Sequence, residues 1–166
     1  MTVHHVVIGV HSPLHKPMFH DVTADAAAAV AASGIRAGTI TVYSQHTTCS
    51  VIIQEESHDR TFDGTEFLLQ DMLDRLELMA PKCRHEGQYL HPGPKHIAHA
   101  TGNLHEEAWW SLNTEAHIRS GFIGRSETIP VNDGAMELGE FGRIYFADFD
   151  GMRQRDRKAR FTVIGE

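Results

Sequence analysis

Residues 38–53 of the chain read GTITVYSQHTTCSVII, and this stretch indicates the fold class. The runs 38–43 and 49–53 are short and rich in β-branched residues, as strands usually are. Only the polar residues 44–48 separate the two runs. Strands joined by short connections are usually antiparallel, because parallel pairing needs a long crossover. The stretch therefore predicts two strands in a mainly antiparallel structure.

Further strands and helices are predicted on both sides of this stretch. Strands are expected at residues 3–10 and near 127–131, 143–149 and 159–164. Helices are expected over about 23–33, over 61–79 and from Asn113 or Thr114 to about 122, from capping residues and apolar periodicity. Residues 81–105 are rich in proline, glycine and histidine and are predicted to form a long loop.

The order of these elements predicts a single compact α+β domain over residues 1–166. Strands outnumber the two or three expected helices, and short turns join most of the strands, so mainly antiparallel β-sheets are favoured. A length of 166 residues corresponds to about one domain. The sequence has no internal repeat and no low-complexity linker.

Composition excludes several classes of protein. The 15 basic and 22 acidic residues give a net charge of −7, which argues against a nucleic-acid or anionic membrane partner. No apolar run approaches the roughly 18 residues of a membrane span. The N-terminus lacks a secretory signal, and Cys49 and Cys83 form no CxxC pair. A cytoplasmic protein with two reduced thiols is therefore predicted.

Histidine is the unusual component, with 13 residues in the chain. Six of them fall within 33 residues: His85, His91, His96, His99, His105 and His117. Neutral imidazoles are common metal ligands, and three of them with one open position form a usual catalytic zinc site. The spacing from His96 to His99 matches no metal motif, so a solvated histidine-rich loop is the alternative.

Three other segments carry groups that could perform chemistry. His46-Thr47-Thr48 lies between the two central strands, where it either binds a metal or phosphate or serves as a polar connection. Residues 153–158 read RQRDRK and form either a clamp for a phosphate or a solvated turn before the last strand. Asp71 and Asp74 flank the apolar face of helix 61–79. Trp109-Trp110 is predicted to lie in the core or at an interface.

Several of these segments, in this order, resemble motifs of the YjbQ family. The segment from Gln45 to Glu55 resembles the H-T-S/T-A-S…I-N-E strands of that family, and Tyr89-Leu90-His91 resembles its Y-x-H. Ala116-His117-Ile118-Arg119-Ser120 resembles its A-H-I-K-A helix start. Asp150–Arg155 and Val163–Glu166 complete the match, which covers nearly the whole chain.

The resemblance implies a YjbQ-like fold, a homotrimer with a site at the subunit boundary, and a divalent metal, for which zinc suits imidazole ligands. By position, the implied metal ligands are His46, His91 and His117. The implied catalytic carboxylates are Glu55 and Asp71. The residues assigned to phosphate are Thr47, Ser50, Arg119, Arg153 and Arg155.

The function that the resemblance implies is a metal-dependent transferase or hydrolase acting on a small phosphorylated substrate. Members of the family are assigned a secondary thiamine-phosphate synthase activity, which joins a pyrimidine diphosphate to a thiazole phosphate and releases pyrophosphate. The alternative is a non-catalytic, metal- or anion-binding trimeric scaffold.

The chain also departs from the family pattern. Cys49 stands where the family commonly has alanine. We interpret it as a small buried thiol, with a reactive nucleophile as the alternative. The family's L-G-T-W-Q-G becomes Leu138–Arg143 without tryptophan or glutamine. The stretch 92–110 replaces a short acidic loop. These departures predict a divergent member of the family.

Overall fold

The computed structural model describes residues 1–13 and 15–166. In this part of the chain, eight strands and four α-helices are present, with one short 3₁₀ helix, η1. They are β1 (Thr2–Ser12), β2 (Met18–Asp21), α1 (Thr23–Ser33), β3 (Gly38–Ser44), β4 (Cys49–Glu55), α2 (Phe67–Met79), α3 (Pro94–Asn103), η1 (Ala108–Ser111), α4 (Thr114–Ile123), β5 (Ser126–Asn132), β6 (Ala135–Met136), β7 (Gly142–Asp148) and β8 (Arg155–Gly165).

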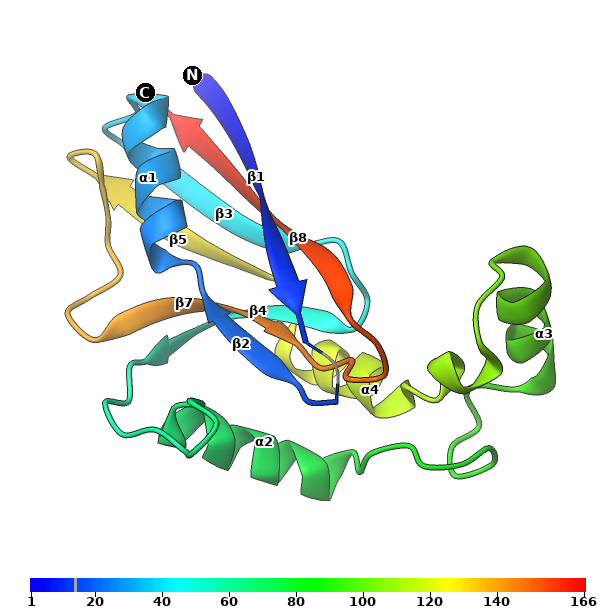
Figure 1. Ribbon diagram of the computed structural model, residues 1–166. Coiled ribbons are helices and arrows are strands. Elements are labelled where there is room, and N and C mark those ends of the chain that lie inside the picture. The colour runs from blue at the N-terminus through cyan, green and yellow to red at the C-terminus, as the bar shows by residue number, and fades with distance from the viewer. Residues whose placement is uncertain (14) are drawn as a thin grey trace.

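The strands form two antiparallel sheets. The larger sheet has the order β1-β8-β3-β5-β6, and the smaller sheet has the order β2-β7-β4. Every pair of neighbouring strands in these two sheets is antiparallel. Helix α1 runs along the larger sheet, whereas α2 and α4 lie on the far side of the smaller one (Figure 1). The predicted α+β domain with mainly antiparallel sheets is therefore confirmed.

The two strands of residues 38–53 are present, but they belong to different sheets. β3 pairs with β5 and β8, whereas β4 pairs with β7. Two of the connections between the sheets are short and are called the two crossings below: residues 45–48 join β3 to β4, and residues 149–154 join β7 to β8. The Phe149 amide donates a hydrogen bond to the Thr48 carbonyl at 3.1 Å, so the two crossings lie side by side.

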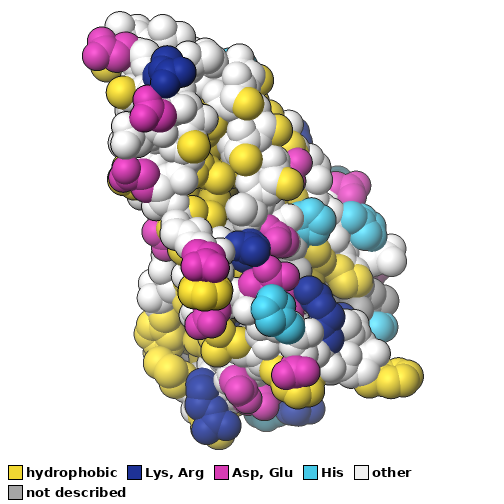
Figure 2. All heavy atoms as spheres, turned by 90° about the vertical axis from the view of Figure 1, so that its left-hand side faces the viewer, with side chains coloured by type: hydrophobic (Ala, Val, Ile, Leu, Met, Phe, Trp, Pro, Cys, Tyr) yellow, Lys and Arg dark blue, Asp and Glu magenta, His cyan; other side chains and the backbone are white. Residues whose placement is uncertain are grey.

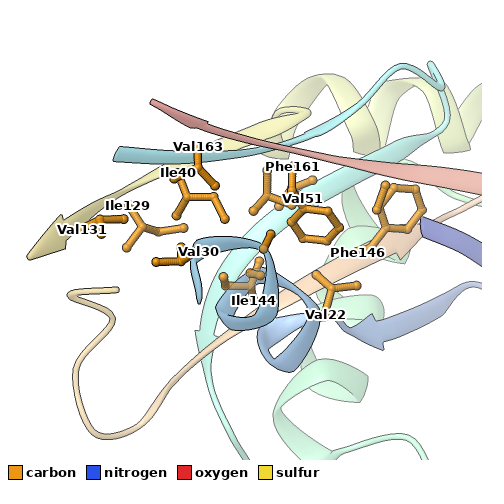
Figure 3. Packing of buried hydrophobic residues seen from close by; sticks show 14 of the residues in the cluster. Val22, Val30, Ile40, Val51, Ile129, Val131, Ile144, Phe146, Phe161 and Val163 are labelled. Atoms are coloured by element: carbon orange, nitrogen blue, oxygen red, sulfur yellow. The ribbon is translucent and has the colours of Figure 1, made fainter. Parts of the chain in front are cut away.

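The main core lies between the two sheets and α1. Ile40, Phe161 and Val163 from the larger sheet meet Val51 and Phe146 from the smaller one (Figure 3). The alternate residues of β4 and β7 face the opposite way. Ile52 and Tyr145 pack against Leu69 of α2, and Ala147 packs near Ala116 of α4. Because both faces of β4 and β7 are covered, these strands read as continuous apolar runs.

Helix α2 begins at Phe67, whereas the sequence predicted a start near residue 61. The intervening segment forms a tight turn instead. Gly64 has a φ of 87°, and the Asp63 carboxylate accepts hydrogen bonds from the Thr61 hydroxyl and the Thr65 amide. Such side-chain bonds to nearby backbone compete with the helix, which explains its later start.

Two predictions on the helices are wrong. Residues 81–105 are not one long loop, because α3 occupies Pro94–Asn103, and the described residues therefore hold four α-helices rather than two or three. Pro94 stands at the first helical position, where a missing N–H costs nothing. Ala100 is the only buried residue of α3, so the sequence lacks the apolar stripe by which helices are predicted.

The surface carries charges of both signs. On the face shown in Figure 2, acidic and basic side chains are interspersed with hydrophobic ones. Among the described residues, no helix has the length and apolar character needed to cross a membrane.

Candidate functional site

A pocket of about 360 Å³ opens where the two crossings between the sheets meet. Its wall is completed by η1 and the first turn of α4. The lining residues are Gln45, His46, Thr47, Thr48, His96, Glu106, Trp110, Ser111, Asn113, His117, Asp150, Arg155 and Arg157. Segments from four parts of the sequence thus converge on one polar cavity.

The base of the pocket is a buried ion pair. The Arg157 Nε donates to the Asp148 carboxylate at 2.6 Å, and its Nη2 donates to Thr48 Oγ1 at 3.0 Å. The Ser12 hydroxyl donates to the same carboxylate at 2.6 Å. Burial lowers the pKa of Arg157, but the hydrogen bond and charge of Asp148 outweigh it and raise the pKa overall. This network ties the end of β7 to β8 and to the first crossing.

Above this pair, Arg155 and Asp150 face the cavity. The Asp150 carboxylate accepts from Asn113 Nδ2 at 3.1 Å and from Arg155 Nη2 at 3.0 Å. Burial lowers the pKa of Arg155, and the neighbouring Arg157 and Arg153 lower it further, against the opposing effect of Asp150. The Arg155 guanidinium stays charged, and it has N–H donors beyond the one that Asp150 accepts.

Unpartnered hydrogen-bond donors collect in this pocket. In residues 1–13 and 15–166, four buried side-chain atoms lack a hydrogen-bond partner, and three of them belong to pocket residues: Arg155 Nε, Trp110 Nε1 and Ser111 Oγ. The first two can only donate, and the hydroxyl can donate as well. Leaving such a group unsatisfied costs about 1–3 kcal/mol. The pocket is therefore short of hydrogen-bond acceptors.

Three imidazoles stand next to one another at the α4 side. The ring centroid of His91 lies 5.5 Å from that of His117 and 4.6 Å from that of His96. Thr114 Oγ1 donates its proton to the His91 carbonyl at 2.5 Å. The same hydroxyl oxygen therefore accepts a hydrogen bond from His91 Nδ1 at 3.0 Å. Because the proton of the neutral His91 ring is on Nδ1, its Nε2 has a free lone pair. The His117 ring bonds the Thr47 backbone, and burial lowers the pKa of both His91 and His117. Both are therefore neutral at pH 7.

His46 is held differently. Its Nε2 accepts the Lys158 backbone N–H at 3.0 Å, so the ring carries its proton on Nδ1. Burial, followed by the charge of Arg157, lowers the pKa of His46. In this arrangement His46 offers a donor to the pocket and no free lone pair. No group of three His, Cys, Asp or Glu side chains in the described part of the chain is arranged to hold a metal ion.

The structure brings some of the predicted phosphate ligands to the pocket and not others. Thr47 and Arg155 line it, and Arg153 lies at its edge, paired with Glu106. The Ser50 hydroxyl is buried against the Ser120 carbonyl, 3.5 Å away. Arg119, the fifth predicted phosphate ligand, lies elsewhere.

Arg119, Glu55 and Asp71 lie outside the pocket. The Arg119 guanidinium binds the Ala80 carbonyl at the end of α2, at 2.7 Å from Nη2, and it also binds Glu77. Glu55 is exposed at the far end of β4, six residues or about 20 Å beyond Cys49. Asp71 is exposed on α2. The structure therefore separates both predicted catalytic carboxylates from the histidines.

Cys49 is a buried thiol beneath the pocket. Burial, followed by the charge of Asp148, raises the pKa of Cys49 far above its ordinary value. A thiol held in the protonated form is a poor nucleophile. This agrees with the interpretation of Cys49 as a small buried side chain.

Several pocket residues were missed from the sequence, and one pattern would have found Arg157. Residues 155–163 alternate, so Arg157 and the predicted Arg155 continue the inward row of Ala159, Phe161 and Val163. When residues 153–158 are interpreted as a turn, the sequence does not predict where their arginine side chains point. Asp150, Asn113, Trp110 and Ser111 lie in loops or at helix starts and carry no comparable periodic signal.

Two antiparallel sheets and a polar pocket at the crossings between them define a class of small α+β proteins. Within that class, a family model described as UPF0047 protein YjbQ-like matches residues 10–166. The chain therefore belongs to the YjbQ-like UPF0047 family, which confirms the resemblance found in the motifs.

Relatives and solved structures agree with this assignment. A UPF0047 protein of Methanothermobacter thermautotrophicus is 31% identical over 146 residues, which are 88% of this chain and 82% of the relative. YugU of Bacillus subtilis, also a UPF0047 protein, is 28% identical over 135 residues, 81% of this chain and 82% of the relative. Identities of this size fit a divergent member.

The fold matches crystal structures of the same family. An uncharacterized conserved yjbq/upf0047 protein from Clostridium acetobutylicum superposes with a TM-score of 0.70 at 26% identity, covering 96% of this chain and 99% of that one. A protein of unknown function from Sulfolobus solfataricus gives a TM-score of 0.70 at 20% identity, with 99% and 100% covered, which supports the fold alone.

Proposed function

We propose that this pocket binds a small phosphorylated substrate and that the chain is an enzyme acting on it. The observation that carries the proposal is that three residues lining one cavity, Arg155, Trp110 and Ser111, each carry a buried side-chain donor without a hydrogen-bond partner. Phosphate oxygens are strong acceptors, and a charged guanidinium binds them more strongly than a neutral donor does.

Arg155 is the residue best suited to hold the phosphate. Its Nη2 is fixed by Asp150 at 3.0 Å, so the guanidinium is oriented before the substrate arrives. Its Nε has no hydrogen-bond partner in the protein and can donate to a phosphate oxygen. Thr47 and the Nδ1–H of His46 add donors from the first crossing. Preorganised donors of this kind stabilise negative charge as it develops in a transition state.

His117 is the residue best suited to move a proton. It lines the pocket and is neutral, because burial lowers its pKa. His91, whose ring centroid lies 5.5 Å from that of His117, is also neutral. A neutral imidazole accepts a proton at pH 7, and such a general base typically contributes 10²–10⁴-fold in rate.

The family resemblance suggests one reaction of this class, the thiamine-phosphate synthase reaction. There the bond from the pyrimidine methylene carbon to the diphosphate oxygen breaks, a bond from that carbon to the thiazole nitrogen forms, and pyrophosphate leaves. Arg155 would neutralise the charge that collects on the leaving diphosphate. This substrate pair is part of the proposal and is open to replacement by another phosphorylated compound.

The predicted zinc ion fits His91 and His117 better than His46. In each of the first two rings one nitrogen is anchored by a neighbour, as second-shell partners anchor metal-bound histidines. When bound, a divalent metal would polarise a phosphoryl oxygen. The roles given above to Arg155 and His117 do not depend on that ion.

Cytoplasmic location is part of the same proposal. Cys49 and Cys83 are both buried and free. Unpaired thiols are usual in reducing compartments, and this supports the predicted location.

Calorimetric titration with inorganic phosphate tests the binding site. Wild type is expected to bind phosphate, and Arg155→Gln is expected to bind it at least tenfold more weakly. The matched control is Arg36→Gln, an exposed arginine paired with Asp133 far from the pocket, which should leave the affinity unchanged. Equal affinities in wild type and Arg155→Gln would contradict the proposal.

A coupled pyrophosphate-release assay tests catalysis. Wild type is expected to release pyrophosphate from the pyrimidine diphosphate and thiazole phosphate pair, and Arg155→Gln to be at least 100-fold slower, because Arg155 neutralises the leaving diphosphate. Running the assay with and without added zinc separates the metal prediction from the role of Arg155. Phosphate binding without turnover of phosphorylated compounds would favour the alternative, a non-catalytic anion-binding scaffold.

A further inference from the structure

Two of the three unpartnered donors belong to one short helix. Trp110 and Ser111 end η1, and Trp110 is the last residue of the stretch 92–110 that is unlike the short acidic loop expected of the family. Arg155, the third donor, stands on β8. The residues that line the pocket therefore carry one charged donor on the sheet and two neutral donors on η1.

The Trp110 ring is held so that its N–H has a fixed direction. The Arg153 guanidinium lies 4.1 Å from the ring centroid on one side, and the Trp109 ring meets it edge-on at 5.9 Å. Arg153 is in turn paired with Glu106. Ser111, beside Trp110, is buried, with only 5% of its surface exposed. Both donors are thus preorganised, which is the condition for selective hydrogen bonding.

Charge distinguishes these two donors from Arg155. Around the cavity three arginines are matched by three carboxylates: Arg153 by Glu106, Arg155 by Asp150 and Arg157 by Asp148. One bound phosphate adds negative charge beyond these three ion pairs, and Arg155 binds it. A second anionic group at Trp110 would lie beside Glu106 with no further cation to match it. A neutral oxygen acceptor has no such penalty.

We infer that Trp110 and Ser111 determine specificity by binding a neutral oxygen acceptor, such as a carbonyl, next to the phosphate of the substrate. The inference rests on the proposed function, because it assumes that Arg155 holds the phosphate. The substrate class it names is a phosphate monoester that carries a carbonyl within a few bonds of the ester oxygen. Neither member of the thiamine-phosphate pair has a carbonyl, so the inference replaces that pair by another phosphorylated substrate. A site built to hydrogen-bond a group strongly rejects the analogue that lacks it.

Three small monoesters of similar size test this inference by calorimetry. Propyl phosphate has no second acceptor, hydroxyacetone phosphate has a carbonyl, and phosphoglycolate has a carboxylate. Two neutral hydrogen bonds correspond to an affinity gain of about tenfold. Wild type is expected to bind hydroxyacetone phosphate about tenfold more tightly than propyl phosphate, and phosphoglycolate no more tightly than propyl phosphate.

Matched variants assign this preference to residues. Trp110→Phe keeps a ring beneath Arg153 and removes only the N–H, and Ser111→Ala removes only the hydroxyl. Each should lower the preference for hydroxyacetone phosphate about threefold while leaving propyl phosphate within twofold of wild type. Phe62→Leu is the control, because Phe62 is fully exposed and does not line the pocket, and it should keep the full preference.

The outcomes separate the two proposals. Equal binding of hydroxyacetone phosphate and propyl phosphate by wild type would overturn the specificity role of Trp110 and Ser111 but leave phosphate binding intact. Tighter binding of phosphoglycolate than of hydroxyacetone phosphate would overturn the choice of a neutral acceptor. Failure of wild type to bind any of the three would overturn the proposed function and the inference with it.

Discussion

The geometry of the pocket depends most on two residues, Asp148 and Arg157, which form a buried ion pair. Both side chains are almost fully buried, with exposed fractions of 1% and 5%. Buried ion pairs are costly to desolvate and stable only when their hydrogen bonds are satisfied. Here Ser12, Thr48 and the Asp150 amide complete the network. Arg157 thereby fixes the position of both crossings between the sheets.

Removal of one partner of this pair is expected to be severe. Arg157→Met leaves the Asp148 carboxylate buried without its counter-charge, which typically costs about 3–5 kcal/mol. Urea unfolding measures the loss. The control is Arg36→Gln at the exposed pair with Asp133, where about 1 kcal/mol or less is expected. A loss below about 1 kcal/mol for Arg157→Met would show that the pair is not structurally important.

The buried histidines make stability depend on pH. Burial lowers the pKa of His91 and of His117 in the folded chain. Below about pH 6.5 the unfolded chain therefore binds more protons than the folded one, and the free energy of unfolding falls as the pH drops. Wild type should lose stability between pH 7.5 and 5.5, and His117→Gln should lose less. Urea unfolding at both pH values measures the difference, and equal losses in both proteins would contradict the pKa assignment.

At the scale of elements, Arg119 illustrates how family position and structure diverge. The residue stands on α4 at a basic position of the family motif, yet its guanidinium binds the last carbonyl of α2, that of Ala80. A cation at a helix C-terminus is stabilising. The two helices are thus joined by one buried side chain on the side of the molecule away from the pocket.

Arg119→Ala is therefore expected to affect stability and not phosphate binding. Loss of the bonds to Ala80 should lower the free energy of unfolding by roughly 1–3 kcal/mol. Phosphate affinity by calorimetry should remain within twofold of wild type. A selective loss of phosphate affinity with unchanged stability would instead support the role assigned to Arg119 from the family position.

The strands and most helices could be predicted from the sequence because their patterns are local. Alanine-rich α1 matches its predicted range, and α4 and the six predicted strands are confirmed within a few residues, whereas the short strands β2 and β6 were not predicted. What could not be predicted depends on tertiary contacts. The sequence gives no sign that β3 and β4 separate into two sheets, and α3 buries only Ala100.

The candidate site was predicted in part for the same reason. His46, His117, Thr47 and Arg155 were singled out and do line one pocket. Glu55 and Asp71 were placed with them by motif alone, although a strand of seven residues carries Glu55 to the opposite end of the sheet. The acceptor-poor character of the pocket depends on which donors lack partners, and only the folded structure reveals that.

For the whole molecule, the uncovered face of the larger sheet bears on the predicted homotrimer. Val3, Val7, Tyr43 and Ile164 lie on its strands and are each at least 37% exposed. Exposed apolar patches on sheets commonly mark contacts between chains. Light scattering after size exclusion should give three times the chain mass of 18.5 kDa, and Val7→Glu should give the mass of a single chain. A wild-type protein with the mass of one chain would contradict the trimer.

The most direct test of the phosphate site is a crystal structure grown with tungstate, a phosphate analogue whose anomalous signal locates it. The expected result is one strong peak in the pocket between the two crossings, with an oxygen within about 3 Å of Arg155 Nε, as in a charge-assisted hydrogen bond. The same crystals of Arg155→Gln should lose that peak. A peak elsewhere on the molecule, with the pocket empty of tungstate, would contradict the account.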